Sequence, residues 1–202
     1  MNKINYQKLL DEVIASVVKN DVKPRLLLHA CCAPCSSYVL EYLSEFFEIT
    51  LYFYNPNIFP SEEYAFRAEE LKRLACEMTL PESVKVEVED YNSDEFYNKI
   101  AGRERDPEGG ARCKICYELR LRRAAEYAAE HRFDYFTTTL SISPYKNSVW
   151  INEIGESMAK EYGVKHLPSD FKKNNGYKRS IELSKEYELY RQDYCGCEYS
   201  KK

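Results

Sequence analysis

Three of the chain's eight cysteines fall within a short stretch of its 202 residues. Cys31, Cys32 and Cys35 follow an apolar run at residues 26–28 and precede a helix-like segment at residues 36–47. Cysteines that serve only packing do not need to be adjacent, whereas clustered thiolates are good ligands for soft metals. The cluster therefore predicts a soft-metal site at the end of the first strand.

Cys113 and Cys116 form the second cysteine motif. Side chains three positions apart share one face of a helix, so both thiolates can hold one metal centre. A helix N-terminus at this point would also favour the thiolate form through its dipole. With Cys31 and Cys32 the pair offers four sulfur ligands, which suit Zn²⁺ or an iron–sulfur cluster. Adjacent cysteines can bind different corners of a cubane, whereas zinc ligands are usually spaced further apart, so the spacing favours the cluster over zinc.

Cys195 and Cys197 form the third motif, separated by a single glycine near the C-terminus. Such a pair can close a small, strained disulfide, and strain raises the reduction potential. The pair therefore suits the relay of electrons better than a structural disulfide, and the aromatic residues around it also favour a redox role. The alternative is a tail with incidental thiols.

The remaining cysteines and the histidine beside the cluster have open roles. Cys35 is either a small buried side chain, an additional ligand or a thiol that faces the substrate. Cys76 is expected in the core, on the apolar face of a helix with Leu71 and Leu74. His29 is expected near the site, where it can brace the turn.

Helices and strands alternate along the chain. We expect strands at residues 25–29, 49–54, 84–88, 135–140 and 164–167, and helices at 5–18, 36–47, 61–77, 93–100, 113–131, 148–162 and from 177 to 190. Pro34 suits a first helical turn and Ser61 a helix cap. The alternation predicts one α/β domain over residues 1–202, with a mainly parallel sheet covered by helices on both faces. We further expect an N-terminal helical extension at 5–18 and a C-terminal helix and tail at 168–202.

The polar motifs fall where this fold would place a ligand. Open parallel sheets bind ligands beyond the carboxyl ends of their strands. The cysteine cluster follows the first strand, residues 54–57 follow the second, and residues 137–141 follow the fourth. The sequence therefore predicts a site at this edge.

Composition narrows the setting. Hydrophobic residues make up 44% and charged residues 31% of the chain, and no apolar run has the length of a membrane span. The N-terminus lacks a signal-peptide core, so we expect the cytoplasm, where stable structural disulfides are rare. The net charge of −4 argues against a general nucleic-acid binder. Residues 101–123 and 165–191 each carry seven Lys/Arg against four Asp/Glu, which fits either RNA contacts or solvated helix faces.

Two common catalytic arrangements are missing from the sequence. No Walker A pattern or glycine-rich turn follows the first strand, and only seven glycines occur in the chain. No Ser-His-Asp arrangement stands out. Glu62 and Glu63 suit the first turn of a helix at least as well as paired acid–base catalysis.

Taken together, the motifs resemble the QueH-type epoxyqueuosine reductases. The resemblance runs in order from about residue 24 to residue 200. Its segments are residues 29–35, 54–58, 110–116, 138–146, 170–173 and 189–197, with Glu63, Tyr64 and Arg67. Each segment alone is weak evidence, whereas the ordered set is specific.

The resemblance implies a cytoplasmic iron–sulfur oxidoreductase that catalyses the last step of tRNA queuosine biosynthesis. Such enzymes reduce the epoxide of epoxyqueuosine, in the anticodon loop of tRNA, to the cyclopentene of queuosine. The implied fold is the PP-loop or HUP-like α/β type without the ATP-binding loop, in accord with the missing phosphate loop. The implied partners are a tRNA and an unidentified electron donor, with no membrane.

The resemblance also implies roles for the cysteines. Cys31, Cys32, Cys113 and Cys116 would hold a [4Fe–4S] cluster, and Cys195 and Cys197 would form a redox-active disulfide. An additional mononuclear iron is implied beside the cluster, with Cys35 and Asp170 as candidate ligands.

Further expectations concern the tRNA and the rival classes. Residues 103–123 and 172–179 are candidate contacts for RNA phosphates, and Tyr54 or Tyr145 could stack on the extruded nucleoside. The rivals are a cluster-containing PP-loop-like tRNA sulfurtransferase and a zinc-stabilised RNA-binding module. ATP dependence would support the first, and stoichiometric zinc in colourless protein would support the second.

Overall fold

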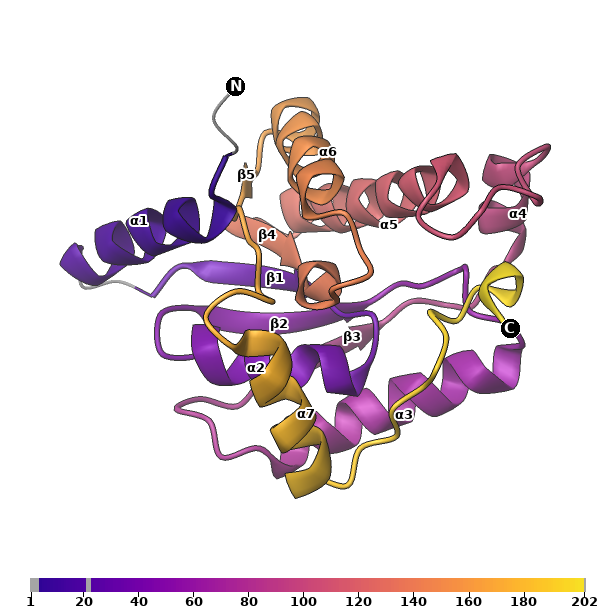
Figure 1. Ribbon diagram of the computed structural model, residues 1–202. Coiled ribbons are helices and arrows are strands. Elements are labelled where there is room, and N and C mark those ends of the chain that lie inside the picture. The colour runs from indigo at the N-terminus through magenta and orange to yellow at the C-terminus, as the bar shows by residue number, and fades with distance from the viewer. Residues whose placement is uncertain (1–3, 21–22, 202) are drawn as a thin grey trace.

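The computed structural model describes residues 4–20 and 23–201 (Figure 1). Five parallel strands form one sheet in the order β3-β2-β1-β4-β5. Their bounds are β1 (Arg25–His29), β2 (Glu48–Phe53), β3 (Lys85–Val88), β4 (Tyr135–Thr138) and β5 (Lys165–His166). The predicted α/β fold with a mainly parallel sheet is therefore confirmed.

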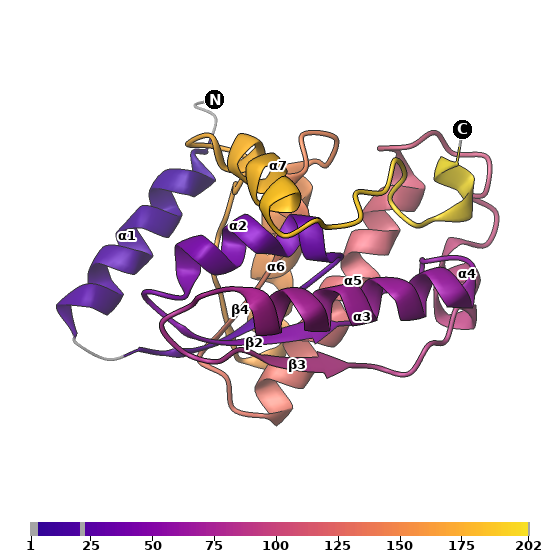
Figure 2. The same cartoon turned by 90° about the horizontal axis from the view of Figure 1, so that it is seen from below.

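Helices cover both faces of the sheet (Figures 1 and 2). They are α1 (Tyr6–Lys19), α2 (Ala33–Leu43), α3 (Ser61–Glu77), α4 (Asp94–Ile100), α5 (Ala111–Glu130), α6 (Ser148–Tyr162) and α7 (Gly176–Glu186), with the 3₁₀ turns η1 (Thr139–Ile142) and η2 (Glu198–Ser200). Side chains of α1, α2 and α3 pack into one hydrophobic core, and those of α5 and α6 pack into the other. Within the described ranges, no helix is long and apolar enough to cross a membrane.

The central strand β1 explains the apolar run before the cysteine cluster. Side chains alternate across a strand, so Leu26 and Leu28 enter the core beside α2 while Leu27 enters the core beside α5. A strand buried on both faces reads as a continuous apolar run. His29 ends this strand and is fully buried. The cysteine turn therefore starts from the most enclosed strand of the sheet.

Several element boundaries differ from those expected. The helix α2 begins at Ala33 instead of residue 36, with Pro34 in its first turn as predicted, and it ends at Leu43. The fourth strand ends at Thr138, after which the chain tightens into η1. Ser61 is the first residue of α3 and not its cap, because Pro60 holds that position.

The prediction that Cys76 lies in the core is wrong. Leu71 and Leu74 are fully buried on the inner face of α3, whereas Cys76 is exposed. A residue two positions after Leu74 is rotated by about 200° around a helix of 3.6 residues per turn. Cys76 therefore points to the opposite side.

Candidate active site

The cysteine turn brings three sulfurs together. The Sγ atoms of Cys31, Cys32 and Cys35 all lie within 4.8 Å of one another, and those of Cys31 and Cys32 are 3.8 Å apart. Tetrahedral thiolates at about 2.3 Å from one ion are separated by about 3.8 Å, so this spacing is close to that of a metal site. Cys32 occupies the N-cap position of α2, and Cys35 lies in its first turn. Cys35 thus belongs with the pair that precedes it.

Hydrogen bonds fix the backbone of the cysteine turn and the histidine that precedes it. The backbone N–H of Cys31 donates to Oγ1 of Thr139 (3.2 Å), and this hydroxyl lies 3.4 Å from the Cys31 sulfur. His29 Nε2 lies 3.0 Å from the carbonyl of Tyr54, and Nδ1 lies 2.8 Å from the hydroxyl of Thr138. Burial and the charge of Arg120 lower the pKa of His29 to about 4. A neutral histidine with both nitrogens engaged braces the turn and offers no free ligand atom.

The pKa values of the three thiols shift in different directions because the thiols hydrogen-bond to one another. Hydrogen bonds from Cys32 and then Cys35 lower the pKa of Cys31 well below its ordinary value, although burial opposes the shift. The bond to Cys31 raises the pKa of Cys32 to about 12. Hydrogen bonds with Cys31 and then Cys32 raise the pKa of Cys35. One thiolate therefore forms readily at Cys31, which is the form that binds metal.

Cys113 and Cys116 lie in the first two turns of α5, on one face of the helix, as expected. The Cys113 sulfur accepts a hydrogen bond from the N–H of Gly109 (3.2 Å), and Cys116 is buried. Across the described ranges, neither sulfur belongs to the close group of Cys31, Cys32 and Cys35. The pair instead lines a small adjoining cavity.

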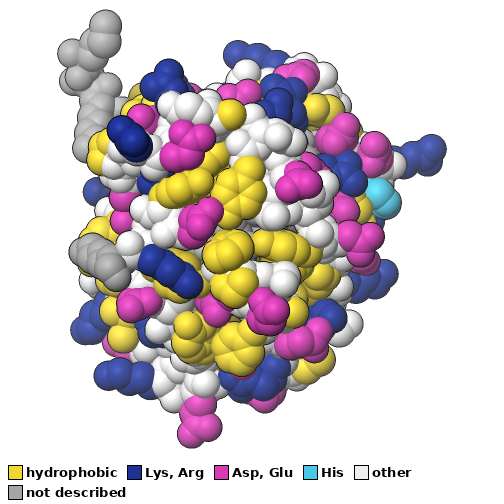
Figure 3. All heavy atoms as spheres, turned by 90° about the vertical axis from the view of Figure 1, so that its right-hand side faces the viewer, with side chains coloured by type: hydrophobic (Ala, Val, Ile, Leu, Met, Phe, Trp, Pro, Cys, Tyr) yellow, Lys and Arg dark blue, Asp and Glu magenta, His cyan; other side chains and the backbone are white. Residues whose placement is uncertain are grey.

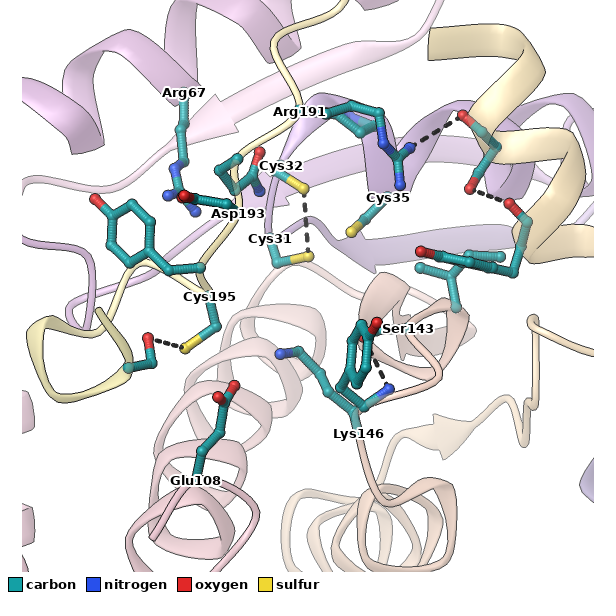
Figure 4. Close-up of a pocket in the computed structure, with 18 of the residues that line it drawn as sticks. Cys31, Cys32, Cys35, Arg67, Glu108, Ser143, Lys146, Arg191, Asp193 and Cys195 are labelled. Atoms are coloured by element: carbon teal, nitrogen blue, oxygen red, sulfur yellow. Dashed lines mark hydrogen bonds between the residues drawn. The ribbon is translucent and has the colours of Figure 1, made fainter. Parts of the chain in front are cut away.

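Two cavities share lining residues at this edge of the sheet, and Figure 4 shows the larger one. The larger has a volume of about 310 Å³ and contains the cysteine turn. Residues that line both cavities are Glu108, Arg120, Tyr145, Lys146 and Cys195. All seven cysteines of the three motifs therefore lie around one connected region, beyond the carboxyl ends of β1 and β4.

Arg120 and Lys146, which line both cavities, have no carboxylate partner within ion-pair distance among the described residues. Arg120 is only 4% exposed and donates to the carbonyl of Cys116 (3.3 Å) and to Oδ1 of Asn55 (3.2 Å). Burial opposes its charge, but the nearby thiols of Cys116 and Cys31 raise its pKa. Lys146 shows the same balance, with Cys195 as the main stabilising neighbour. The site therefore holds positive charge that suits anionic sulfur.

The tail cysteines differ in their access to the cavities. Cys195 lines both cavities, while Cys197 lines only the smaller one and packs with Phe96, Ile100 and Cys116. Both thiols are free. The hydrogen bond from Cys197 lowers the pKa of Cys195 well below its ordinary value, against the effect of burial, and raises that of Cys197. The thiolate of the pair thus forms at Cys195, on the side of the cavity.

Two residues expected at the site lie elsewhere. Asp170 pairs with Lys172 and lines neither cavity. Tyr54 is 5% exposed, and its hydroxyl bonds to Glu95, so it offers no free ring face. Tyr145, by contrast, is 80% exposed and lines both cavities.

From the sequence, Arg120 was expected only among the candidate RNA-phosphate contacts at residues 103–123, and Asn55 only within the segment 54–57 after the second strand. Arg120 stands in a helix among six other basic residues at positions 101–123. Nothing in that pattern separates it from the exposed ones. Asn55 does follow the second strand, where ligand-binding residues are expected, and this position was the only available signal.

The fold and the site together define an α/β protein with a thiol-lined cavity beyond the carboxyl ends of its parallel strands, where a cysteine triad could bind a metal ion. Residues 26–202 match the family described as Epoxyqueuosine reductase QueH. The chain belongs to this family, and the resemblance predicted from the sequence is confirmed.

Curated relatives with the same description span most of the chain. The protein of Streptococcus pyogenes serotype M1 is 46% identical, with 99% of this chain and 79% of the relative covered. That of Staphylococcus epidermidis is 44% identical, with 98% and 85% covered. That of Thermotoga maritima is 35% identical, with 87% and 89% covered. The helix α1 precedes the matched family range, yet the first two alignments span nearly the whole chain.

Proposed function

We propose that this protein reduces epoxyqueuosine in tRNA to queuosine. Removal of the epoxide oxygen as water consumes two electrons and two protons and leaves a carbon–carbon double bond. The family match supports the activity. The observation that carries the site is the convergence of three thiols within 4.8 Å, in a cavity that also contains Cys195.

Cys31, Cys32, Cys113 and Cys116 are the proposed ligands of a [4Fe–4S] cluster. Four thiolates around an iron–sulfur core make an anionic centre, and the unpaired cations Arg120 and Lys146 fit such a charge. When bound, such a cluster supplies electrons one at a time. Cys35 then remains as a thiol for an additional mononuclear iron. Asp170 is left out of this proposal, because Lys172 pairs with its carboxylate away from the cavity.

Cys195 and Cys197 are the proposed store of the electron pair. Cys195 faces both cavities as the thiolate, and Cys197 reaches the smaller cavity as the second thiol. Oxidation of this thiolate–thiol pair to a disulfide releases two electrons and one proton, so the second proton that deoxygenation consumes comes from solvent. An external reductant can restore the pair by thiol–disulfide exchange or electron transfer, and exchange requires access to one of the two sulfurs.

Existing ion pairs reduce the number of basic residues that we propose as RNA contacts. Many cations of the two basic segments already have carboxylate partners: Arg122 with Glu118 and Glu161, Arg123 with Glu89 and Glu126, Arg179 with Glu41 and Glu182, and Lys172 with Asp170. Lys146 and Arg191 line the cavity, and the structure gives neither a carboxylate partner in the described ranges. Tyr145 and Tyr177 line the same cavity. We propose that these four side chains hold the extruded nucleoside and its flanking phosphates.

The test is anaerobic incubation of the iron-loaded protein with tRNA that contains epoxyqueuosine and a chemical reductant. Nucleoside mass spectrometry should show the loss of one oxygen atom. Iron and acid-labile sulfide should be present in brown protein before the assay. Unchanged epoxyqueuosine with fully loaded protein would contradict the activity, and colourless protein with stoichiometric zinc would contradict the cluster.

A further inference from the structure

Arg120 connects the two cysteine loops through hydrogen bonds. It lies one helical turn after Cys116 in α5, and its Nε–H group donates to the carbonyl of Cys116 (3.3 Å). Its guanidinium also donates to Oδ1 of Asn55 (3.2 Å), and the Asn55 amide donates to the carbonyl of Ala30 (2.9 Å). Ala30 directly precedes Cys31. A continuous path of three hydrogen bonds thus joins the backbone at Cys116 to the backbone at the first cysteine pair.

No carboxylate of the described residues lies within ion-pair distance of Arg120, and Glu108, which lines both cavities with it, is not paired with it. Arg67 is similarly buried, but its guanidinium pairs with the carboxylate of Glu63 at 2.7 Å. Both partners of Arg120 are neutral oxygens. Burying a charge is costly unless an opposite charge compensates it. The residues that line the cavities beside Arg120 include Cys31, Cys116 and Cys195.

We propose that Arg120 is a positioning residue that fixes the two cysteine pairs relative to each other and supplies the counter-charge for an anionic iron–thiolate centre. This role rests on the proposed function. Reduction adds a negative charge to such a centre, and a fixed cation nearby stabilises the reduced form more than the oxidised form. Net charge around a cluster is one of the determinants of its potential. Arg120 therefore raises the midpoint potential.

The test uses Arg120→Met and Arg120→Lys in the full chain, loaded with iron under anaerobic conditions. Methionine removes the charge and the donors, whereas lysine keeps the charge and cannot reproduce the planar two-partner geometry. Arg122→Met is the matched control, because Arg122 lies on the same helix and pairs with exposed glutamates. The readouts are iron and sulfide per chain and the midpoint potential from a spectroscopic redox titration.

Arg120→Met should lower iron content several-fold and shift the potential of the loaded fraction to more negative values. Arg120→Lys should recover the potential more fully than the iron content, and Arg122→Met should match the wild type in both. Wild-type iron content and potential in Arg120→Met would overturn the role. Equal losses in Arg122→Met would also overturn it, since they would reflect helix stability alone.

Asn55→Ala gives a second route if Arg120→Met does not fold. It removes the bridge to Ala30 and keeps the Arg120 charge. It should lower iron content and leave the midpoint potential close to that of the wild type, and unchanged iron content would overturn the positioning role. Failure of the proposed function looks different, because the wild type itself would then lack iron or leave epoxyqueuosine unchanged.

Discussion

The cysteine turn and the C-terminal tail line the same cavity but are built in different ways. The turn at Cys31–Cys35 lies between the buried strand β1 and the helix α2, and Thr139 fixes its backbone. The tail has little regular structure before η2. Figure 3 views the side on which α4 and the C-terminus lie and shows hydrophobic side chains gathered there, with charged ones around them.

The tail is held by isolated hydrogen bonds and side-chain packing, without a continuous hydrogen-bond ladder. The N–H of Phe59 donates to the carbonyl of Gly196 (2.9 Å), the Tyr194 hydroxyl donates to the carbonyl of Phe59 (3.2 Å), and the Tyr190 N–H donates to Glu70 (3.2 Å). Segments that lack a hydrogen-bond ladder open more easily than a sheet core. Under the proposed function, this difference would divide the roles between a fixed metal cage beside the sheet and an adjustable thiol pair on the tail.

The largest effect is expected from loss of a cage ligand. Cys113→Ala should abolish the brown colour and lower turnover by more than about 100-fold, since even residues that only support metal ligands matter by about 10- to 100-fold. Iron analysis and the nucleoside assay measure both effects. Cys76→Ala is the control, because Cys76 is exposed on the far face of α3 and should change neither. Full iron content in Cys113→Ala would remove Cys113 from the ligand set.

A smaller effect is expected from loss of a tail thiol. Cys197→Ala should slow turnover by about tenfold, equivalent to about 1.4 kcal/mol in the barrier. Iron and sulfide content should remain at the wild-type level, because the cage is intact. Loss of the cluster in this variant would instead make Cys197 a ligand and erase the proposed difference between turn and tail.

Docking of the tail can be weakened without touching a thiol. Gly196 has a φ of +99°, and an added Cβ would lie 2.8 Å from Cγ1 of Ile58. Gly196→Ala should therefore destabilise the docked tail by about 1–3 kcal/mol and increase its cleavage by proteases. Gly102→Ala is the matched control, with a φ of +80° and open space around the new methyl group. Equal protease resistance of Gly196→Ala and wild type would show that the contact with Ile58 does not hold the tail.

The smallest effect concerns Glu70, which accepts the Tyr190 N–H and pairs with Arg73. Burial alone would raise the pKa of Glu70, but the bonds from Arg73 and Tyr190 lower it below its ordinary value of 4.5. Its contribution to stability is therefore complete above about pH 4.5 and is lost as the pH falls through the lower, folded-state pKa.

Glu70→Gln should weaken tail docking by less than about 1 kcal/mol near neutral pH, in the range of partly exposed ion pairs. Protease cleavage of the tail, measured at neutral pH and at pH 4, should show this small difference shrink in acid. Glu69→Gln is the control, since Glu69 pairs only with the exposed Lys72. A difference between Glu70→Gln and wild type that grows as the pH falls would contradict the predicted direction of the pH dependence.

Sequence patterns predicted the bounds of a helix or strand correctly where residues close in the chain determine its ends. The helix α6 runs from Ser148 to Tyr162 as expected, because the Asn147 side chain caps its first turn and Gly163 ends it in a left-handed conformation. The strand β1 also has the expected bounds, since its apolar run needs burial on both faces. The missed cap at Ser61 shows the limit of such patterns: a capping residue type can also stand one position inside the helix.

The parts of the site that could not be predicted depend on the folded arrangement. The cluster of Cys35 with Cys31 and Cys32 was expected, but the position of Cys35 in the first turn of α2 was not, because that helix was expected three residues too late. The role of Arg120 depends on contacts with Asn55, 65 residues away along the chain. Spacing in the sequence contains no information on such a pair. The cysteines that could carry the chemistry were therefore identified from the sequence, whereas the residues that position them were not.

The proposed storage of electrons by the Cys195–Cys197 pair is tested most directly by a single turnover without external reductant. Iron-loaded, pre-reduced protein would be mixed anaerobically with tRNA that contains epoxyqueuosine, and free thiols at Cys195 and Cys197 would be counted by alkylation and mass spectrometry. We predict that each molecule of queuosine formed accompanies the loss of both thiols. Formation of queuosine with both thiols still free would contradict the proposal that this pair stores the electrons.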